Sequence, residues 1–490
     1  MSIVIESSIN EKKIVQSFQQ FQQTFHVKAL LNHCHIQKKR GYSPYHLFSI
    51  LFLLIFTGKN WYRFLQMKNG QHAKITLNTE NQPLDSTIGI QKDAIYRFLQ
   101  KPTFHWNQFL LLLSHRIIQQ FIQPLNDEKR VTAFILDDSI LHRPESQSVE
   151  LLSWSFDHVS HQMVKGFPML TLGWTDGSSF VPVSFSLLSS PKRYLDPTKN
   201  HTKGDFHPDS YAYKRREAAT LEKPELALQM LQKSMQTGIQ ATYVLFDSWF
   251  AFPKFIQAIQ DQGHHAICML KKGKSFYEYQ GKWLKLESLF KACQEQNRNR
   301  RIQVDEKTTL FGSLQVTLGK NKQGQHNPIK IVFVQNRNKK SKREWLAILS
   351  TDTSLSDEEI IRIYGKRWEI EVFFKSIKSI LKVEKEFQLR IFDSINAHVA
   401  IVCCRYCYLS WLSRKQQDIR TCGTLFYQCC EELKDIQFRE SLERIIKLLI
   451  SFLVEHLHIA ENKLKELFTL FLSSLPSYIL LSLDTIKCES

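Results

Sequence analysis

Acidic residues follow two apolar runs of the chain, a placement that suits metal-dependent chemistry on phosphate esters. Asp247 follows the run 243–246, and Asp137 and Asp138 follow the run 133–136. Such runs predict buried strands, and in α/β sheets sites form at the carboxyl ends of strands. Because neighbouring strand residues point to opposite faces, only one of the two adjacent aspartates shares a site with Asp247. A turn residue or a helix cap is the alternative for either segment.

A third acidic segment, around Glu371, has the periodicity of a helix. At 100° per residue, Tyr364, Arg367, Lys375 and Lys378 all lie within about 40° of Glu371. The apolar residues fall on a separate arc: Ile363, Ile370, Phe373, Phe374, Ile377 and Ile380. The pattern predicts a helix that packs on one side and presents a carboxylate among cations on another. An exposed face with i,i+4 ion pairs would give the same pattern.

The three acidic segments together would suit a two-metal reaction on phosphodiesters. Mg²⁺ takes oxygen ligands and keeps several waters, and two such ions, roughly 3.5–4 Å apart, stabilise the attacking and leaving oxygens. We predict two Mg²⁺ ions, with Mn²⁺ able to substitute. The predicted metal-binding residues are one of Asp137 and Asp138, together with Asp247 and Glu371. The predicted DNA-binding residues are Tyr364, Arg367 and Lys378.

The charge balance favours nucleic acid as a partner. The 490 residues carry a net charge of +18, an excess that attracts polyanions, although a basic protein that binds none is the alternative. With 43% hydrophobic residues the chain is no disordered tail. The strongest apolar run, 47–56, is too short to span a bilayer, and the N-terminus has no signal-peptide pattern.

The order of elements predicts a mixed sheet with helices packed on its faces. Residues 1 to about 105 have helical patterns. Basic residues are spread along these helices and suit either phosphate contact or a solvated face: Lys38, Lys39, Arg40, Lys59, Arg63, Lys92, Arg97 and Lys101. Strands are then expected at 131–136, 169–174, 180–187, 242–246 and 265–270, with helices at 217–235 and 253–262. A β-rich stretch, a long helix at 357–381 and further helical sequence follow.

The spacing Tyr-x2-Arg-x3-Glu-x6-Lys, at Tyr364, Arg367, Glu371 and Lys378, resembles the signature of the bacterial DDE transposases of insertion sequence family four. Trp368 follows the arginine, as it commonly does in that family. The motifs Asp-Asp-Ser at 137–139 and Phe-Asp-Ser-Trp-Phe at 246–250 resemble its first and second acidic motifs. The resemblance covers about residues 90 to 410. It implies that Asp137, Asp247 and Glu371 are the catalytic and metal-binding residues, with Asp138 kept as the alternative first ligand.

The resemblance implies a ribonuclease-H-like α/β fold, a mixed sheet with flanking helices, a β-rich insertion and helical N- and C-terminal regions. The domains expected are a helical N-terminal DNA-binding domain at 1–105, the first part of the catalytic core at 106–273, the β-rich insertion at 274–350, the second part of the core with the Glu-bearing helix at 351–410, and a helical C-terminal region for dimerisation at 411–490.

The resemblance also implies a function. Family members cut a mobile element from donor DNA through hairpin ends and join it to a target. The expected partners are double-stranded DNA at terminal inverted repeats, target DNA and a second copy of the chain, in the cytoplasm beside the nucleoid and without a membrane. An inactive DNA-binding descendant and a metal-dependent nuclease without strand transfer are the alternatives. Some related transposases hold a flipped base on an aromatic side chain; Trp283 and Trp345 are candidates, and neither is assigned.

Overall fold

The computed structural model describes most of the chain between residues 13 and 415. The described ranges are 13–58, 61–62, 90, 92–125, 130–190, 192, 206–273, 275–297, 301–305, 308–320, 326–336, 344–415, 425–427, 429–430 and 470. The chain divides into two compact units, one of residues 1–26, 53–90 and 416–490 and the other of residues 27–52 and 91–415. The second unit contains all three acidic segments.

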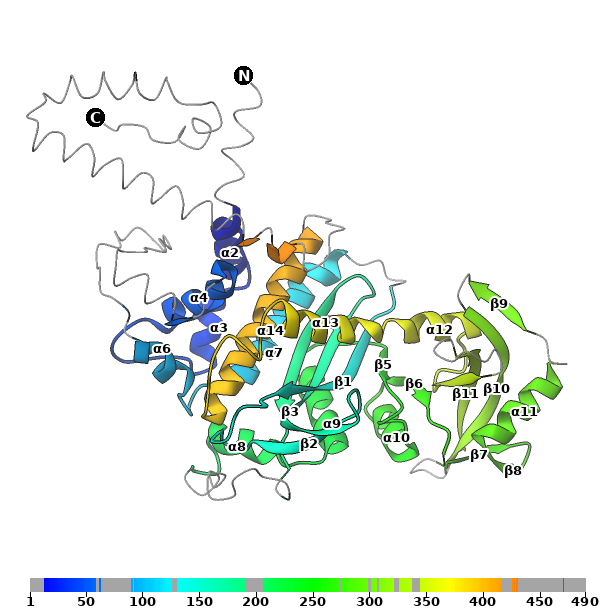
Figure 1. Ribbon diagram of the computed structural model, residues 1–490. Coiled ribbons are helices and arrows are strands. Elements are labelled where there is room, and N and C mark those ends of the chain that lie inside the picture. The colour runs from blue at the N-terminus through cyan, green and yellow to red at the C-terminus, as the bar shows by residue number, and fades with distance from the viewer. Residues whose placement is uncertain are drawn as a thin grey trace, which may run out of the picture. The chain divides into compact units, whose positions relative to one another are not determined.

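One 12-stranded sheet forms the centre of the second unit, with the order β2-β3-β1-β5-β6-β12-β11-β10-β7-β8, β4 beside β3 and β9 beside β10. Its strands are β1 (Ala133–His142), β2 (Ser153–Asp157), β3 (Gln162–Thr175), β4 (Phe180–Leu187), β5 (Tyr243–Phe246), β6 (His265–Leu270), β7 (Phe276–Tyr279), β8 (Lys282–Lys285), β9 (Ile302–Asp305), β10 (Thr308–Lys320), β11 (His326–Gln335) and β12 (Trp345–Ser350). The strand β1 is antiparallel to β3 and parallel to β5. Figure 1 shows the β7–β11 insertion at the opposite end of the sheet from β2 and β3.

Helices cover both faces of the sheet. The described helices of the second unit are α3 (Val27–His33), α6 (Lys92–Leu99), α7 (Trp106–Ile117), α8 (Tyr211–Ala218), α9 (Lys223–Gln236), α10 (Pro253–Asp261), α11 (Leu286–Gln296), α12 (Asp357–Gly365), α13 (Trp368–Ser379) and α14 (Phe392–Lys415). The helix α2 (Lys13–Thr24) belongs to the first unit, and α4 (Pro44–Leu54) begins in the second unit and ends in the first. Phe180 of β4 meets Phe373 of α13 with ring centroids 5.4 Å apart. On the other face, the indole nitrogen of Trp174 donates to the carbonyl of Gln240, just after α9, at 3.0 Å.

The predicted fold class is confirmed: a mixed sheet, flanked by helices and extended by a β-rich insertion, as in a ribonuclease-H-like fold. The strands predicted at 180–187 and 265–270 match β4 and β6. Strand β2 was not predicted, because its exposed and half-buried residues lack a continuous apolar run. The C-terminal region beyond residue 430 lies, apart from residue 470, outside the described residues.

Two long predicted helices are wrong, because each is broken into two. The helix expected at 217–235 is α8 and α9, and Pro224 lies in the first turn of α9, where its missing N–H costs nothing. The helix expected at 357–381 is α12 and α13. Around Lys366 and Arg367 the backbone hydrogen bonds span three residues instead of four, which tightens the chain for one turn.

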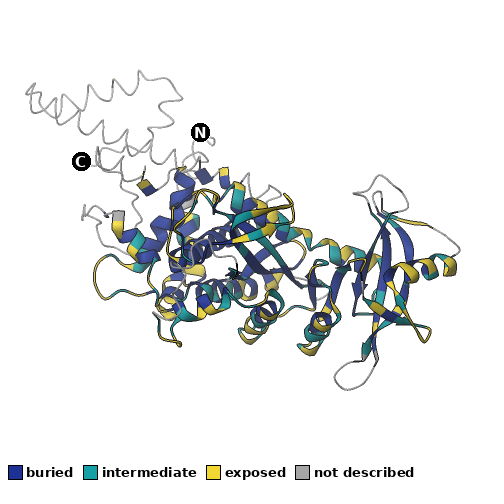
Figure 2. Ribbon diagram, turned by 60° about the horizontal axis from the view of Figure 1, so that its bottom comes forward, coloured by how far each residue is buried: buried dark blue, intermediate teal, exposed yellow. Residues whose placement is uncertain are grey.

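The core contains ionic pairs as well as apolar side chains. Figure 2 shows that the strands and the inner faces of the helices are buried. Asp393, at the start of α14, accepts hydrogen bonds from Arg215 and Arg216 of α8, at 3.0 and 2.9 Å. Arg216 also donates to Glu150 at 2.6 Å. These buried charges join α8, α14 and the segment before β2.

Among the described residues, no helix is long and apolar enough to cross a membrane.

The Asp393 cluster predicts a large loss of stability on Asp393→Ala. The substitution leaves Arg215 buried without a carboxylate and Arg216 with Glu150 as its remaining partner, which costs about 3–5 kcal/mol of unfolding free energy. Urea denaturation followed by circular dichroism measures it. Asp209→Ala, at a side chain that is 85% exposed, serves as the control and should change stability by less than about 0.5 kcal/mol. Equal effects of the two substitutions would contradict the assignment.

Candidate active site

Parallel pairing of β1 and β5 brings Asp137 and Asp247 together. Leu136 pairs with Phe246; Asp137 is the next residue of β1, and Asp247 is the first residue after β5. Asp247 accepts a hydrogen bond from the backbone N–H of Trp249 at 2.9 Å, and Asp137 accepts one from the backbone N–H of the next residue at 2.8 Å. The two predicted carboxylates therefore lie beside each other at the same edge of the sheet.

Strand alternation separates Asp137 from Asp138. Asp138 points to the face covered by α9 and pairs with Lys223 at 2.8 Å. Asp137 points to the face covered by α13, as does Ser139, two residues further on. Ser139 accepts a hydrogen bond from the ammonium group of Lys378 at 2.7 Å. Strand alternation alone would have placed Ser139 on the face of Asp137, whereas no sequence pattern indicated Lys223 as the partner of Asp138.

Arg367 joins two of the three acidic segments. Its guanidinium lies 3.0 Å from a carboxylate oxygen of Asp137 on β1, and it also pairs with Glu371 one turn further along α13. The ion pair with Glu371 has the i,i+4 spacing that the sequence predicted. The structure thus brings together Asp137, Asp247, Arg367 and Glu371 from two strands and one helix.

The tight turn between α12 and α13 fixes where Arg367 points. The ammonium group of Lys366 donates to the carbonyls of Val131 and Asp176, at 3.2 and 3.4 Å. Glu369 accepts from the hydroxyl of Thr175 at 2.7 Å. Gly177 allows this close approach, because a Cβ there would lie 2.2 Å from the Lys366 ammonium. Neither Lys366 nor Glu369 was predicted; both lie beside motif residues, but only the fold shows their partners.

The carboxylates of the site are crowded and shielded from water, and this changes their pKa values. Burial, and then the charge of Asp247, raise the pKa of Asp137 to about 7, against the opposing effect of Arg367. Burial also raises the pKa of Asp247. Three carboxylates thus share one guanidinium, which leaves an excess of negative charge when all are ionised. An additional cation would be stabilised here.

Oxygen ligands from Asp137, Asp247 and Glu371 fit a divalent ion of the magnesium type in their chemistry. In the arrangement described, however, Glu371 is turned to Arg367. No group of three acidic, histidine or cysteine side chains in the described part of the chain is close enough to hold a metal ion. A bound ion therefore requires at least one of these side chains to turn.

The side chains predicted to bind DNA, and Lys375 beside them, differ in their burial and partners. Arg367 lies over the ring of Tyr364, 5.9 Å from its centroid, and the Tyr364 hydroxyl is buried. Burial raises the pKa of that phenol. Lys378 is half-buried beside Ser139, and Lys375 is exposed. The DNA-binding roles of Tyr364, Arg367 and Lys378 stay predictions.

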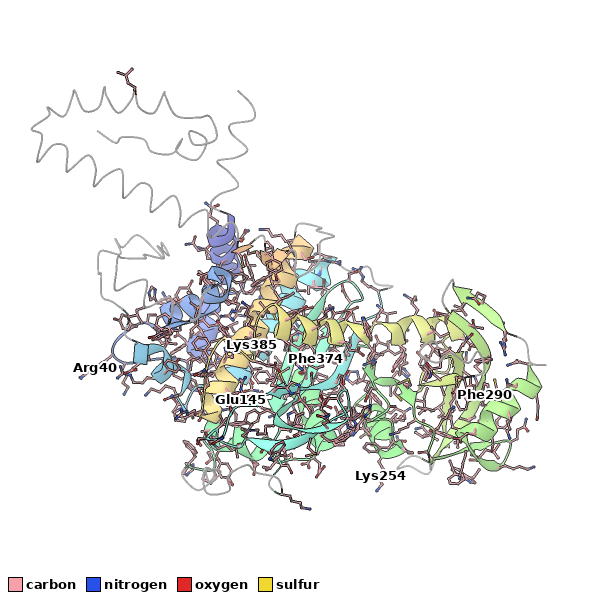
Figure 3. All side chains as sticks on the ribbon, viewed as in Figure 1. Arg40, Glu145, Lys254, Phe290, Phe374 and Lys385 are labelled. Carbon is pink, nitrogen blue, oxygen red and sulfur yellow. The ribbon has the colours of Figure 1, made fainter. Side chains whose placement is uncertain are left out.

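The two tryptophans singled out in the insertion have different surroundings. Trp345 is buried in β12 and stacks on Phe290, with ring centroids 4.5 Å apart, so it belongs to the core of the insertion. Figure 3 labels Phe290 beside β10 and β11. Trp283 is exposed on β8.

Basic residues before β1 lie close together. Burial, and then Lys101 and Arg97, lower the pKa of Lys38, which indicates that the three cations are neighbours. Arg40, labelled in Figure 3, is exposed nearby in the sequence. Lys59 and Arg63 lie outside the described residues, as does the side chain of Lys92. A phosphate contact at these residues stays a prediction.

Two family models match the region that carries this site. The model described as "DDE superfamily endonuclease" matches residues 81–284, which include Asp137 and Asp247. The model described as "Transposase DDE domain" matches residues 214–408, which include Asp247 and Glu371. The chain belongs to the DDE transposases. It is therefore a DNA-cleaving, metal-dependent enzyme. No curated protein matches this DDE transposase.

Opposite orientations of Asp137 and Asp138 predict different effects of the same substitution. Asp137→Asn should abolish DNA nicking, because it removes a charge from the carboxylate group beside Asp247. Asp138→Asn weakens only the partly exposed pair with Lys223, worth about 1 kcal/mol at most, and should leave nicking within about threefold of wild type. A plasmid-nicking assay compares them. Loss of nicking in Asp138→Asn with retention in Asp137→Asn would reverse the assignment of the first ligand.

Proposed function

We propose that the chain cuts and joins the ends of an insertion sequence, through hairpin ends, in the manner of insertion sequence family four. The partners proposed are double-stranded DNA at terminal inverted repeats, target DNA and a second copy of the chain. The observation that carries the proposal is the convergence of Asp137, Asp247 and Glu371 around Arg367, because each of them belongs to a motif that resembles that family's.

Two Mg²⁺ ions, held by Asp137, Asp247 and Glu371, are the proposed cofactors. Bound there, they would stabilise the attacking and leaving oxygens of an in-line displacement at phosphorus. The protein's own contribution is to hold three carboxylates at one edge of the sheet, with Asp137 and Asp247 fixed by backbone N–H groups. The Arg367 guanidinium keeps Asp137 and Glu371 close before DNA arrives.

Arg367 and Lys378 are the proposed phosphate-binding residues. The ring of Tyr364 lies against the Arg367 guanidinium and helps to position it for DNA. A planar guanidinium can bind a phosphate with two parallel hydrogen bonds, and an ammonium group supplies a point charge. Burial lowers the pKa of Lys378, so a phosphate beside it would stabilise its charged form. A nuclease of the same fold without strand transfer would use the same residues, and the products distinguish the two.

Glu371→Gln and Lys378→Ala separate metal binding from DNA binding. Glu371→Gln keeps the shape of the side chain but removes a ligand charge, so nicking, hairpin formation and strand transfer should all be lost while DNA still binds. Lys378→Ala should weaken DNA binding by roughly tenfold or more, as expected for a charged hydrogen bond, and slow hairpin formation. Gel assays on element ends with Mg²⁺ measure each product.

Wild-type protein in excess EDTA provides the control, because binding should persist and cleavage should stop. Near-normal nicking by Glu371→Gln would remove the proposed active site. Nicking without hairpins or joined products would favour the nuclease.

Arg367→Gln should tighten metal binding in the absence of DNA. The substitution removes the cation that pairs with Asp137 and Glu371, so a divalent ion no longer competes with it for these carboxylates. We expect Mn²⁺ affinity to rise by roughly tenfold, equivalent to about 1.4 kcal/mol. Isothermal titration calorimetry measures the affinity, with Arg362→Gln, at an exposed arginine of α12, as the control. Weaker Mn²⁺ binding in Arg367→Gln would contradict the competition.

A further inference from the structure

The hairpin of β2 and β3 presents aromatic side chains to solvent. Trp154 is 37%, Phe156 43% and Met163 42% exposed. Trp154 pairs with Lys165 across the hairpin, and Phe156 pairs with Met163. Because directly paired residues share a face of a sheet, these four side chains form one exposed surface, which we call the hairpin face.

The hairpin face lies on the same side of the sheet as the catalytic carboxylates. Asp137 pairs with Thr171 of β3, so the two side chains share a face. Met163 and Lys165 are an even number of residues from Thr171 along the same strand and therefore point to that face too. The face of the sheet that carries Asp137 continues outward into the hairpin face.

The hairpin also lies near Lys378. The carboxylates of Glu384 and Asp157 oppose the fall in the pKa of Lys378 that burial causes, and Asp157 is the last residue of β2. The base of the hairpin is held against β1, because a Cβ at Gly166 would lie 2.5 Å from the carbonyl oxygen of Leu141. Lys378 bonds to Ser139, three residues before His142, which pairs with Gly166 at the base of the hairpin. The hairpin therefore extends from the sheet beyond the proposed phosphate-binding end of α13.

The composition of the hairpin face suits bases better than phosphates. It has two flat rings, a thioether and a single cation, and the ammonium group of Lys165 lies 5.8 Å from the centroid of the Trp154 ring. The carboxylate of Asp157 is engaged by the backbone of Val159, at 2.9 Å, and by Ser160. A duplex presents phosphates along its outside, whereas unpaired bases offer faces that stack on aromatic side chains.

We propose that the hairpin face stacks on unpaired bases of the DNA strand a few nucleotides away from the scissile phosphate. Trp154 and Phe156 contact the bases, and Lys165 contacts a neighbouring phosphate. The inference rests on the proposed function, because it assumes that DNA strands are opened at the site.

Fluorescence anisotropy without metal tests this with three DNA probes. The probes are a blunt duplex, the same duplex with an unpaired thymine arm, and the same duplex with an arm of abasic sugars. The two arms carry equal phosphates and differ only in their bases. We expect wild-type protein to bind the thymine arm roughly tenfold more tightly than the abasic arm. Trp154→Ala should abolish this preference and Trp154→Phe should keep it. Lys165→Gln should lower the affinity for the thymine arm and for the abasic arm by the same factor.

Val159→Ser is the matched control, because Val159 is 90% exposed on the same hairpin but lacks a ring. Its thymine preference should equal that of wild type. Equal affinity of the wild-type protein for both arms, or an unchanged thymine preference in Trp154→Ala, would overturn the base-stacking inference and leave the proposed function untouched. So would a shift of Trp154→Ala from dimer to monomer in sedimentation with the preference intact, which would assign the face to a second copy. Failure to bind the blunt duplex would instead count against the proposed function.

Discussion

Carboxylates that are crowded together away from water repel one another, and the catalytic region is built around that repulsion. Parallel pairing of β1 with β5 forces Asp137 and Asp247 into neighbouring positions, and burial removes the water that would screen them. Arg367 supplies the compensating charge, because its guanidinium pairs with both Asp137 and Glu371. One guanidinium cannot neutralise three carboxylates, so the same crowding that costs stability favours a bound divalent cation.

Contacts at both ends of α13 hold the helix against the sheet. Lys366 and Glu369, before and at the start of the helix, bond to the loop after β3 and to the last residue of β3. Lys378, near the other end, bonds to β1. The backbone that carries Arg367 and Glu371 is therefore placed by partners other than the acidic residues of the site.

Much of the site followed from the sequence because it depends on local rules. Alternation along a strand separated Asp137 from Asp138, and helical periodicity placed Arg367 beside Glu371. The break between α12 and α13 did not follow, because it is imposed by Lys366 bonding to a turn nearly two hundred residues away in sequence. For the same reason the burial of the Tyr364 hydroxyl and the pairing of Asp138 with Lys223 were unpredictable. The hairpin face was missed because β2 lacks a continuous apolar run.

Asp137, Asp247 and Glu371 are proposed to bind the metal ions together. Anomalous diffraction from crystals of the protein with Mn²⁺ and DNA locates such ions. We expect anomalous peaks within about 2.0–2.3 Å of carboxylate oxygens of Asp137, Asp247 and Glu371, with Arg367 turned away from at least one of them. A peak held by Asp138 instead, with Arg367 still joining Asp137 to Glu371, would contradict this proposal.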